Sequence, residues 1–401
     1  MSNIILSPRV LILDTDLFHP LAVGIANYAR QAGWSNSILF AQRGNASIAS
    51  MVKSWGADAV IVGGTPRAGD YRRWPRGQVP MVLTHDRGGL QYGAADVVLG
   101  FRAAGEMGGQ HLVDLGLRNL AYCWLGNWWP LNDQLEGFRA AAEAAAGTVH
   151  VLDWSWRAAK GVGRSYSAAI RRWLAEQVRP LPKPLGLMVE SDWTALEAEA
   201  AFSEAGIRIP EDVAIVSCYN LAPLCEGAIV PLSSVDMDYH EQGYQAAAML
   251  DRLIHGAPLP EEPLYIQPKG VVVRQSSDMV AVPHKGVAAA MNMIRRDFHD
   301  PDLSVGRLAG AIGVSTFALN WAFRRHLGRT PGDYLRQWRL KQASVLLATT
   351  NRAVKDIAAG CGFGTVDQFI RCMRVATGLT PRAWRKGHSK HGGRSYGVRQ
   401  P

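Results

Sequence analysis

The stretch Leu308-Ala-Gly-Ala-Ile-Gly313 returns 49 residues later as Ile357-Ala-Ala-Gly-Cys-Gly362. Each copy predicts a short helix with apolar residues on one face, ended by a glycine turn. A second helix is expected after each turn, up to Gly328 in the first copy and over Thr365–Thr377 in the second. Self-similarity at a fixed spacing indicates one supersecondary unit used twice. The sequence therefore predicts two helix-turn-helix units, whose second helices can enter the major groove of DNA.

A long helix is expected between the two units. Thr330 and Pro331 are residue types favoured at the N-cap and at the first helical position. The apolar residues that follow are spaced to pack both units against one spine, namely Tyr334, Leu335, Trp338, Leu340, Ala343, Leu346 and Leu347. We call the second helix of each unit its reading helix. One monomer is therefore expected to place its two reading helices in successive major-groove segments, roughly 34 Å apart.

Charge is divided unevenly along the chain. Residues 281–401 carry 20 Lys and Arg against 6 Asp and no Glu, a net charge of +14, whereas residues 1–280 carry −5. Lys and Arg neutralise phosphates, so a basic module on a mildly acidic body favours nucleic acid as a partner. A solvated basic surface is the alternative that charge alone leaves open.

The first 280 residues alternate short apolar runs with amphipathic segments, which is the pattern of βαβ units. Strands are expected at Val10–Leu13, Ile38–Ala41, Ala59–Val62, Met81–Leu83, Val97–Leu99, Leu120–Leu125, Val149–Leu152, Leu185–Val189, Val213–Cys218 and Ser233–Met237. Helices are expected at Leu21–Ala32, Ala103–Leu115, Leu131–Ala146, Ser165–Gln177, Thr194–Ala205 and His240–His255. Ten strands exceed one sheet of usual size, so two α/β lobes are predicted.

Polar and aromatic side chains follow many of these strands, where ligands of α/β proteins bind. Carboxylates suit hydroxyl groups, and aromatic faces can stack on the apolar face of a sugar ring. Packing within the protein core is the alternative role for the tryptophans. The candidate ligand residues are Asp14, Asp16, Asp86, Trp128, Trp129, Asp192, Trp193, Tyr219 and Asn220.

The segment Ala353–Arg385, with Ile357-Ala-Ala-Gly-Cys-Gly-Phe-Gly364 at its centre, resembles the DNA-binding domain of the AraC/XylS family. It departs from the family at Met373, where Phe is usual, and at Trp321, where Arg or a small polar residue is usual. The resemblance implies base-facing positions at Thr316, Phe317, Asn320, Trp321, Thr365, Val366, Asp367, Ile370 and Arg371. Arg371 is the strongest candidate, because Arg to guanine is the commonest specific contact. Phosphate contacts are expected from Arg324, Arg325, Lys341, Arg374, Arg382 and Arg385.

Seven segments in the first 280 residues together resemble the LacI/GalR and periplasmic-binding-protein type I fold. They are Gly108–Tyr122, Glu136–Ala141, Ser191–Ala195, Ile209–Ser217, Pro231–Asp236, Gly243–Ala247 and Val272–Ser276. The resemblance implies a small-molecule effector, commonly a sugar. Gly100, Gln134, and Tyr219 with Asn220 stand where the family usually has charged sugar anchors, and Asp192 is retained. Gln134 therefore joins the candidate ligand residues, and the identity of the effector stays open.

Other function classes receive little support from the sequence. It contains no phosphate-binding, metalloprotease or serine-hydrolase motif, so neither a cofactor nor a metal is expected. The cysteines form no C-x-x-C pair and are expected to be reduced, buried thiols: Cys123, Cys218, Cys225, Cys361 and Cys372. No segment has the composition of an export signal or of a membrane-spanning helix, so a cytoplasmic protein without membrane contact is expected.

These features predict a two-lobed α/β domain over residues 1–280, a linker at 281–286, an all-α AraC-type domain at 287–387 and a disordered basic tail at 388–401. The combination resembles the XylR type of AraC-family regulator. We expect a homodimeric transcription activator that binds double-stranded DNA and a sugar such as xylose, with RNA polymerase as a candidate partner. One alternative is a regulator whose first domain only dimerises or binds a non-sugar ligand. The other is an α/β enzyme or binding protein with an accessory basic domain.

Overall fold

The computed structural model describes residues 8–13, 20–34, 38–41, 48–63, 79–84, 88–125, 130–154, 166–279 and 284–388. The chain divides into two compact units. The first unit comprises Met1–Ala104 and Asp236–Pro268, and the second comprises Gly105–Val235 and Lys269–Pro401. Within the described residues, no helix is long and apolar enough to cross a membrane.

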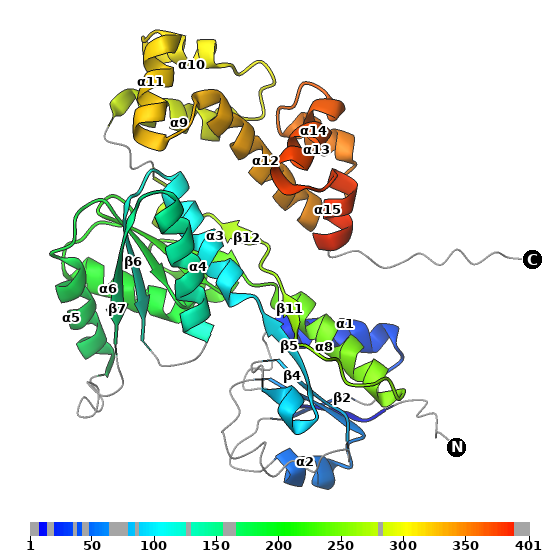
Figure 1. Ribbon diagram of the computed structural model, residues 1–401. Coiled ribbons are helices and arrows are strands. Elements are labelled where there is room, and N and C mark those ends of the chain that lie inside the picture. The colour runs from blue at the N-terminus through cyan, green and yellow to red at the C-terminus, as the bar shows by residue number, and fades with distance from the viewer. Residues whose placement is uncertain are drawn as a thin grey trace, which may run out of the picture. The chain divides into compact units, whose positions relative to one another are not determined.

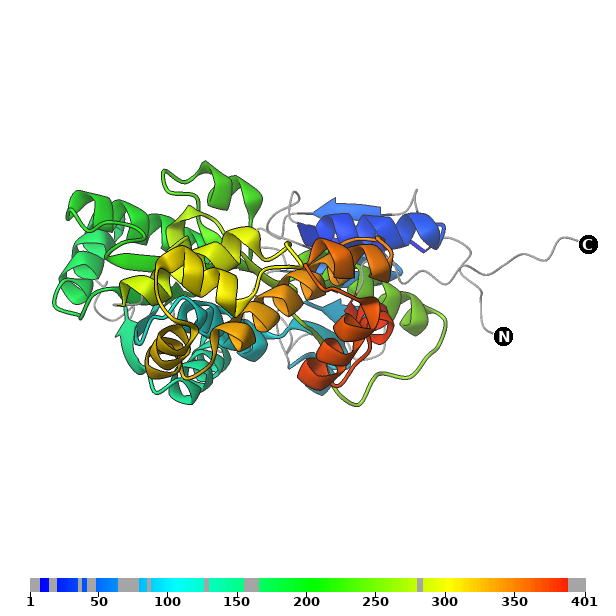
Figure 2. The same cartoon turned by 90° about the horizontal axis from the view of Figure 1, so that it is seen from above.

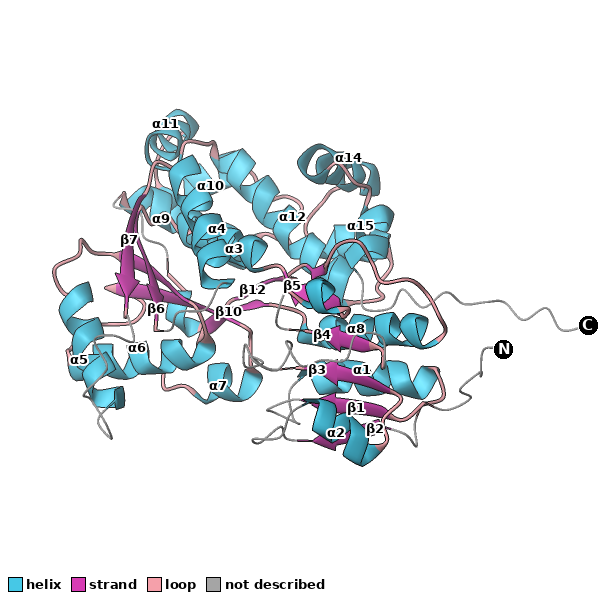
Figure 3. Ribbon diagram, turned by 60° about the horizontal axis from the view of Figure 1, so that its bottom comes forward, coloured by secondary structure: helices cyan, strands magenta, loops and turns pink. Residues whose placement is uncertain are grey.

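The first unit is built on one parallel sheet with the strand order β11-β5-β4-β3-β1-β2. Its strands are β1 (Val10–Leu13), β2 (Ile38–Ala41), β3 (Ala59–Val62), β4 (Met81–Leu83), β5 (Ala95–Leu99) and β11 (Leu264–Ile266). Its helices are α1 (Pro20–Gln31), α2 (Ile48–Trp55) and α8 (Tyr239–Ile254). Helix α2 covers one face of the sheet, and α1 and α8 lie together on the other (Figure 3). Alternate strand residues face the two layers, so both faces are apolar and buried.

The second unit contains a sheet of the same kind, with the order β12-β10-β9-β8-β6-β7. Its strands are β6 (Asn119–Trp124), β7 (Thr148–Asp153), β8 (Leu185–Val189), β9 (Val213–Cys218), β10 (Ser233–Asp236) and β12 (Gly270–Val272). Its helices are α3 (Phe101–Asp114), α4 (Pro130–Ala144), α5 (Tyr166–Val178), α6 (Asp192–Glu204) and α7 (Ala222–Gly227). Helices α5 and α6 bury Leu174 and Phe202 against one face of this sheet. Helix α3 begins in the first unit and ends in the second.

All ten predicted strands and all six predicted helices of this region are confirmed, with bounds that agree within two residues. Four elements were not predicted: α2, α7, β11 and β12. The strands β11 and β12 are three residues long and only partly buried. A run of three partly buried residues gives no clear periodic signal.

Seven helices form the C-terminal part of the second unit (Figure 1). They are α9 (Lys285–Asp297), α10 (Val305–Ile312), α11 (Thr316–Leu327), α12 (Pro331–Thr349), α13 (Val354–Gly360), α14 (Val366–Thr377) and α15 (Pro381–His388). Helix α12 packs Tyr334 and Leu335 into one core, and Leu340, Ala343 and Leu347 into another. Figures 1 and 2 show α12 running from one group of helices to the other. The predicted spine is therefore confirmed.

Helix α9 is a correction to the predicted layout. It begins at Lys285, inside the segment predicted as linker, and His284 caps it by accepting a hydrogen bond from the Val287 amide at 3.3 Å. Residues 281–283 of that linker and residues 389–401 of the predicted tail lie outside the described residues, and His388 belongs to α15. Four of the five cysteines are buried, as expected.

Candidate functional sites

The first reading helix, α11, has a buried face and an exposed face. Leu319 and Phe323 are buried in the core, whereas Phe317 is 80% exposed and Trp321 59% exposed. Ser315 caps the helix, since its hydroxyl accepts from the Ala318 amide at 3.1 Å. The predicted contact residues Thr316, Phe317, Trp321, Arg324 and Arg325 are all exposed, and Asn320 is half-buried.

The second reading helix, α14, repeats this arrangement. Phe369 and Met373 are buried, and the predicted contact residues Val366, Asp367, Arg371 and Arg374 are exposed. Met373 thus fills the core position where the family usually has Phe. Among the described residues, Arg371 forms no ion pair or hydrogen bond through its side chain, so its guanidinium is free to bind a partner. Thr365 differs, because its hydroxyl caps the helix by accepting from the Gln368 amide at 3.1 Å.

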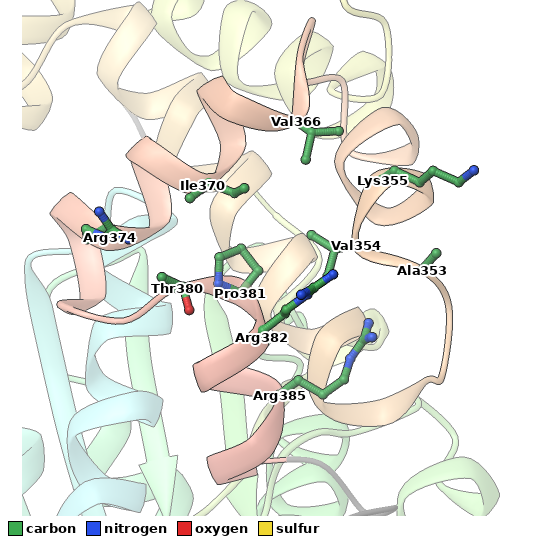
Figure 4. Close-up of a pocket in the computed structure, with 10 residues that line it drawn as sticks. All are labelled: Ala353, Val354, Lys355, Val366, Ile370, Arg374, Thr380, Pro381, Arg382 and Arg385. Carbon is green, nitrogen blue, oxygen red and sulfur yellow. The ribbon is translucent and has the colours of Figure 1, made fainter.

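A groove of about 660 Å³ runs beside α14 (Figure 4). Figure 4 shows Val354 on α13, Val366 and Ile370 on α14, and Pro381 on α15. These apolar residues are accompanied by four cationic side chains: Lys355, Arg374, Arg382 and Arg385. A groove lined by both apolar and cationic side chains suits a nucleic-acid strand, because the strand offers phosphates together with apolar sugar and base surfaces. Three of the four cations were predicted as phosphate contacts, and Lys355 was missed.

Lys341 does not belong to this surface, contrary to the prediction. It is part-buried, and its ammonium lies 5.7 Å from the centre of the Trp338 ring. Burial lowers the pKa of Lys341, and the charges of Arg295 and Arg329 add to this effect. Lys341 therefore packs on the spine helix rather than presenting its charge to phosphates.

Asp192 is an internal structural residue. It is fully buried, and its carboxylate accepts from the Ser217 hydroxyl, from the Ser234 hydroxyl at 2.7 Å and from the Leu221 amide at 2.7 Å. Burial raises the pKa of Asp192, and these hydrogen bonds oppose the rise. Its oxygens tie α6 to β9 and β10. The expectation that Asp192 contacts a ligand is therefore replaced by a role in holding the sheet edge.

The other predicted ligand residues that the structure describes in the second unit have different environments. Trp193 is 63% exposed. Tyr219 and Asn220 follow β9 with φ angles of 102° and 55°. Arg274 donates to Asn220 Oδ1 at 3.0 Å. Asp14, Asp16, Asp86, Trp128 and Trp129 lie outside the described residues.

Glu190 is a residue that the sequence reasoning missed. It follows β8 directly and is 9% exposed. Its Oε1 accepts from the Thr194 hydroxyl at 2.7 Å and the Leu125 amide at 3.1 Å, whereas its Oε2 has no hydrogen-bond partner in the part of the chain that the structure describes. Desolvation by burial raises the pKa of Glu190 to about 7. The rule that selected Asp192, a carboxylate just after an apolar strand, applies equally to Glu190.

Unsatisfied donors lie near this carboxylate. Cys123 pairs with Val189 across β6 and β8, so Trp124 and Glu190 are neighbours at the carboxyl ends of the two strands. Within the described ranges, the indole nitrogens of Trp124 and Trp154 have no hydrogen-bond partner. The buried Gln134 accepts from the Tyr122 hydroxyl, and the weakly accepting Cys218 thiol lies beside its amide nitrogen. Unpaired buried polar groups are costly, so a cluster of them at this edge indicates a site for a polar ligand.

Two families match the chain. A periplasmic binding protein-like domain family matches residues 110–277, and a helix-turn-helix domain family matches residues 308–387. The chain is thus similar to a periplasmic binding protein-like domain followed by a helix-turn-helix domain. The first match covers the sheet with Glu190 and Gln134, and the second covers α11, α14 and the groove beside α14.

Curated transcription regulators are similar to parts of this chain. The xylose operon regulatory protein of Escherichia coli strain K12 is 26% identical over 217 residues, which are 54% of this chain and 55% of that protein. The Haemophilus influenzae protein of the same name is 27% identical over 222 residues, 54% of this chain and 57% of that protein. The chain thus matches about half the length of these relatives. The transcriptional activator RhaR of Cronobacter sakazakii is 41% identical over 68 residues, 17% of this chain and 24% of that protein.

Solved structures have the same fold. The structure of the xylose-binding transcription activator xylR is 20% identical, with a TM-score of 0.54 over 95% of this chain and 98% of that chain. The transcription regulator CcpA of Lactococcus lactis is 18% identical, with a TM-score of 0.56 over 68% of this chain and 100% of that chain. The predicted fold class, a two-sheet α/β domain followed by a helical domain with two helix-turn-helix units, is confirmed.

Proposed function

We propose that this chain is a sequence-specific transcription regulator that binds double-stranded DNA through its helix-turn-helix domain and responds to a small-molecule effector. The observation that carries the proposal is the pair of exposed reading helices, α11 and α14, joined by one spine helix in a segment of net charge +14. The similarity to xylose operon regulatory proteins and to RhaR supports the same function.

Each reading helix has a distinct role on DNA. Arg371 of α14 reads guanine through a bidentate hydrogen bond, because its guanidinium is exposed and unpaired within the described chain. Arg374, Arg382 and Arg385 bind phosphates from the groove beside α14, and they position the domain without reading sequence. On α11, Arg324 and Arg325 bind phosphates from the last helical turn.

The effector binds at the carboxyl edge of the second sheet, with Glu190 and Gln134 contributing polar groups. Glu190 Oε2 accepts a hydrogen bond from the effector, and the Trp124 indole donates one, because neither atom has a hydrogen-bond partner among the described residues. Hydroxyl groups both donate and accept, so a monosaccharide satisfies both atoms, and xylose is the first candidate. The effector acts by favouring one conformation of the chain over another.

Further features of the proposed regulator follow from its domains. It acts as a cytoplasmic homodimer and activates transcription by contacting RNA polymerase.

A second candidate is a regulator whose first domain only dimerises. It is favoured by the hydrogen bonds of Asp192, which are made within the protein. A sugar screen by thermal shift separates the two, since the second candidate shows no stabilisation by any sugar. The enzyme alternative is set aside, because the matched relatives are transcription regulators.

Selection of bound duplexes from a random library tests DNA recognition directly. The wild-type chain is expected to enrich one motif with two half-sites. Arg371→Ala is expected to relax one position and to weaken binding by ~1–3 kcal/mol. Val375→Ala is the matched control, because Val375 lies on the same helix at 89% exposure and carries no charge. An unchanged motif and affinity for Arg371→Ala would remove Arg371 from base recognition.

A further inference from the structure

Helix α11 presents an apolar surface where a reading helix faces its partner. Phe317 and Trp321 are four residues apart, so they lie on one face, and Ala318 is exposed beside them. Val314, in the turn before the helix, is 36% exposed. A groove of about 380 Å³ lies along this face, lined by His284, Gly286, Val314, Phe317, Ala318, Leu319, Trp321 and Ala322. Large aromatic side chains this exposed mark an interaction surface.

The polar side chains near this face are largely committed within the helix. Asn320 Nδ2 donates one of its two N–H groups to the Thr316 carbonyl at 2.8 Å, which leaves one N–H of the amide for adenine. The Ser315 hydroxyl is occupied as the N-cap. Helix α11 therefore offers two large exposed aromatic rings, whereas α14 offers the free guanidinium of Arg371 beside the smaller apolar side chains Val366 and Ile370. The two reading helices of one chain differ in the chemistry they present.

Charge identifies the partner of this apolar surface. Arg324 and Arg325 are exposed in the last turn of the same helix, and residues 281–401 contain no Glu. The partner must combine dense negative charge with small apolar groups. Double-stranded DNA does so, because the major groove lies between two rows of phosphates and displays the 5-methyl group of each thymine.

We propose that α11 recognises its half-site through thymine 5-methyl groups packed against Phe317 and Trp321, whereas α14 recognises its half-site through the hydrogen bonds of Arg371. This inference rests on the proposed DNA-binding function. It predicts that the α11 half-site contains conserved A·T pairs and that the methyl groups themselves carry the selectivity.

Deoxyuridine tests the inference, because it pairs as thymine does but lacks the 5-methyl group. The probe is the duplex selected by the wild-type chain, with deoxyuridine replacing thymine in one half-site at a time. Replacement in the α11 half-site is expected to weaken binding about fourfold for each contacted methyl group. Replacement in the α14 half-site supplies the internal comparison. Phe317→Ala and Trp321→Ala are expected to bind the thymine duplex more weakly and to lose most of the sensitivity to deoxyuridine.

Three outcomes are decisive. If the wild-type chain selects a motif in which Arg371→Ala relaxes one position, but deoxyuridine in the α11 half-site changes nothing, the inference is overturned while the proposed function stands. If the chain selects no DNA at all, both fail. If Phe317→Ala alters self-association and leaves DNA selectivity unchanged, the surface binds a second copy and the inference is wrong. Far-ultraviolet circular dichroism checks that each variant retains its helices.

Discussion

Glu190 is a buried carboxyl group of the second unit whose protonation is coupled to folding. Its folded-state pKa of about 7 lies above the ordinary value of 4.5, because burial disfavours the charged form. The folded state therefore binds more protons than the unfolded state between these values. The stability contributed by the neutral carboxyl is fully present below pH 4.5, and it is lost as pH rises through about 7.

We predict that Glu190→Gln removes this pH dependence. The glutamine oxygen can accept the same two hydrogen bonds, and it carries no charge to desolvate. The stability of the wild-type chain relative to the variant should fall by up to about 3 kcal/mol between pH 4.5 and pH 8. Urea unfolding at several pH values measures the difference, with Glu211→Gln at an exposed position as control. Parallel stability profiles for wild type and Glu190→Gln would show that the pKa of Glu190 is the same in the folded and unfolded states.

At the scale of the element, the two helix-turn-helix turns share a glycine in the same backbone conformation and differ in packing. Gly313 and Gly362 both have a φ of +76°. A Cβ atom at Gly313 would have no heavy atom within 4 Å, whereas one at Gly362 would lie 2.2 Å from the Phe298 carbonyl oxygen. The second turn therefore packs directly against the end of α9.

We predict that the same substitution has unequal effects in the two turns. Gly313→Ala should cost about 1–2 kcal/mol, the price of a left-handed alanine. Gly362→Ala should cost distinctly more, because the backbone of α9 must also move away. Chemical denaturation of the two variants gives the comparison, and Gly313→Ala serves as the control for backbone strain. If both variants lose the same free energy of unfolding, the backbone at Phe298 moves away from the added methyl group at no cost.

At the scale of the whole molecule, α3 leads from the first unit to the helix-turn-helix domain. Asp114, its last residue, forms an ion pair with Arg329 at 3.0 Å, and both side chains are 19% exposed. The Tyr334 hydroxyl donates to the Asp114 carbonyl at 3.4 Å, and the Arg329 guanidinium lies 5.1 Å from the Tyr334 ring centre. Arg329 lies just before the first residue of α12, and Tyr334 lies within the first turns of that helix. The helix that leaves the first unit is thus bonded to the spine of both reading helices.

We predict a measurable coupling between Asp114 and Arg329. A double-mutant cycle with Asp114→Asn and Arg329→Gln should give about 1–2 kcal/mol, because the pair is shielded from water and hydrogen-bonded. The exposed pair Arg208 and Asp212 is the control and should give under about 1 kcal/mol. A coupling near zero at Asp114 and Arg329 would argue against α3 as a connection to the DNA-binding helices.

Assembly is the second prediction at this scale. We expect a homodimer of about 87 kDa, twice the 43.7 kDa of the chain. Two helix-turn-helix domains on one dimer raise the effective concentration at tandem sites, so DNA binding should be steeper for duplexes with two complete sites than with one. Light scattering at micromolar concentration, with and without DNA, measures the mass. A mass of one chain in both conditions would contradict this expectation.

The sequence by itself determined the elements and their types. The apolar runs specify the ten predicted strands, and the repeated Gly313 and Gly362 turns specify two helix-turn-helix units on one spine. These patterns are local, since burial of one helix face or of a whole strand leaves its period in the sequence. The cap residues Ser315 and Thr330 act within three residues of their partners, so they too can be recognised from sequence.

Tertiary structure alone decided which polar side chains are hydrogen-bonded or packed within the protein and which can bind a partner. Asp192 and Glu190 both follow β8, yet the first is hydrogen-bonded by Ser217, Ser234 and Leu221, and the second keeps one oxygen without a partner among the residues described. Lys341 looks like a phosphate contact in sequence and instead packs on Trp338. Such differences arise because hydrogen-bond partners and burial come from segments far apart in the chain. No local period records them, and only the packed sheet and helices bring those partners together.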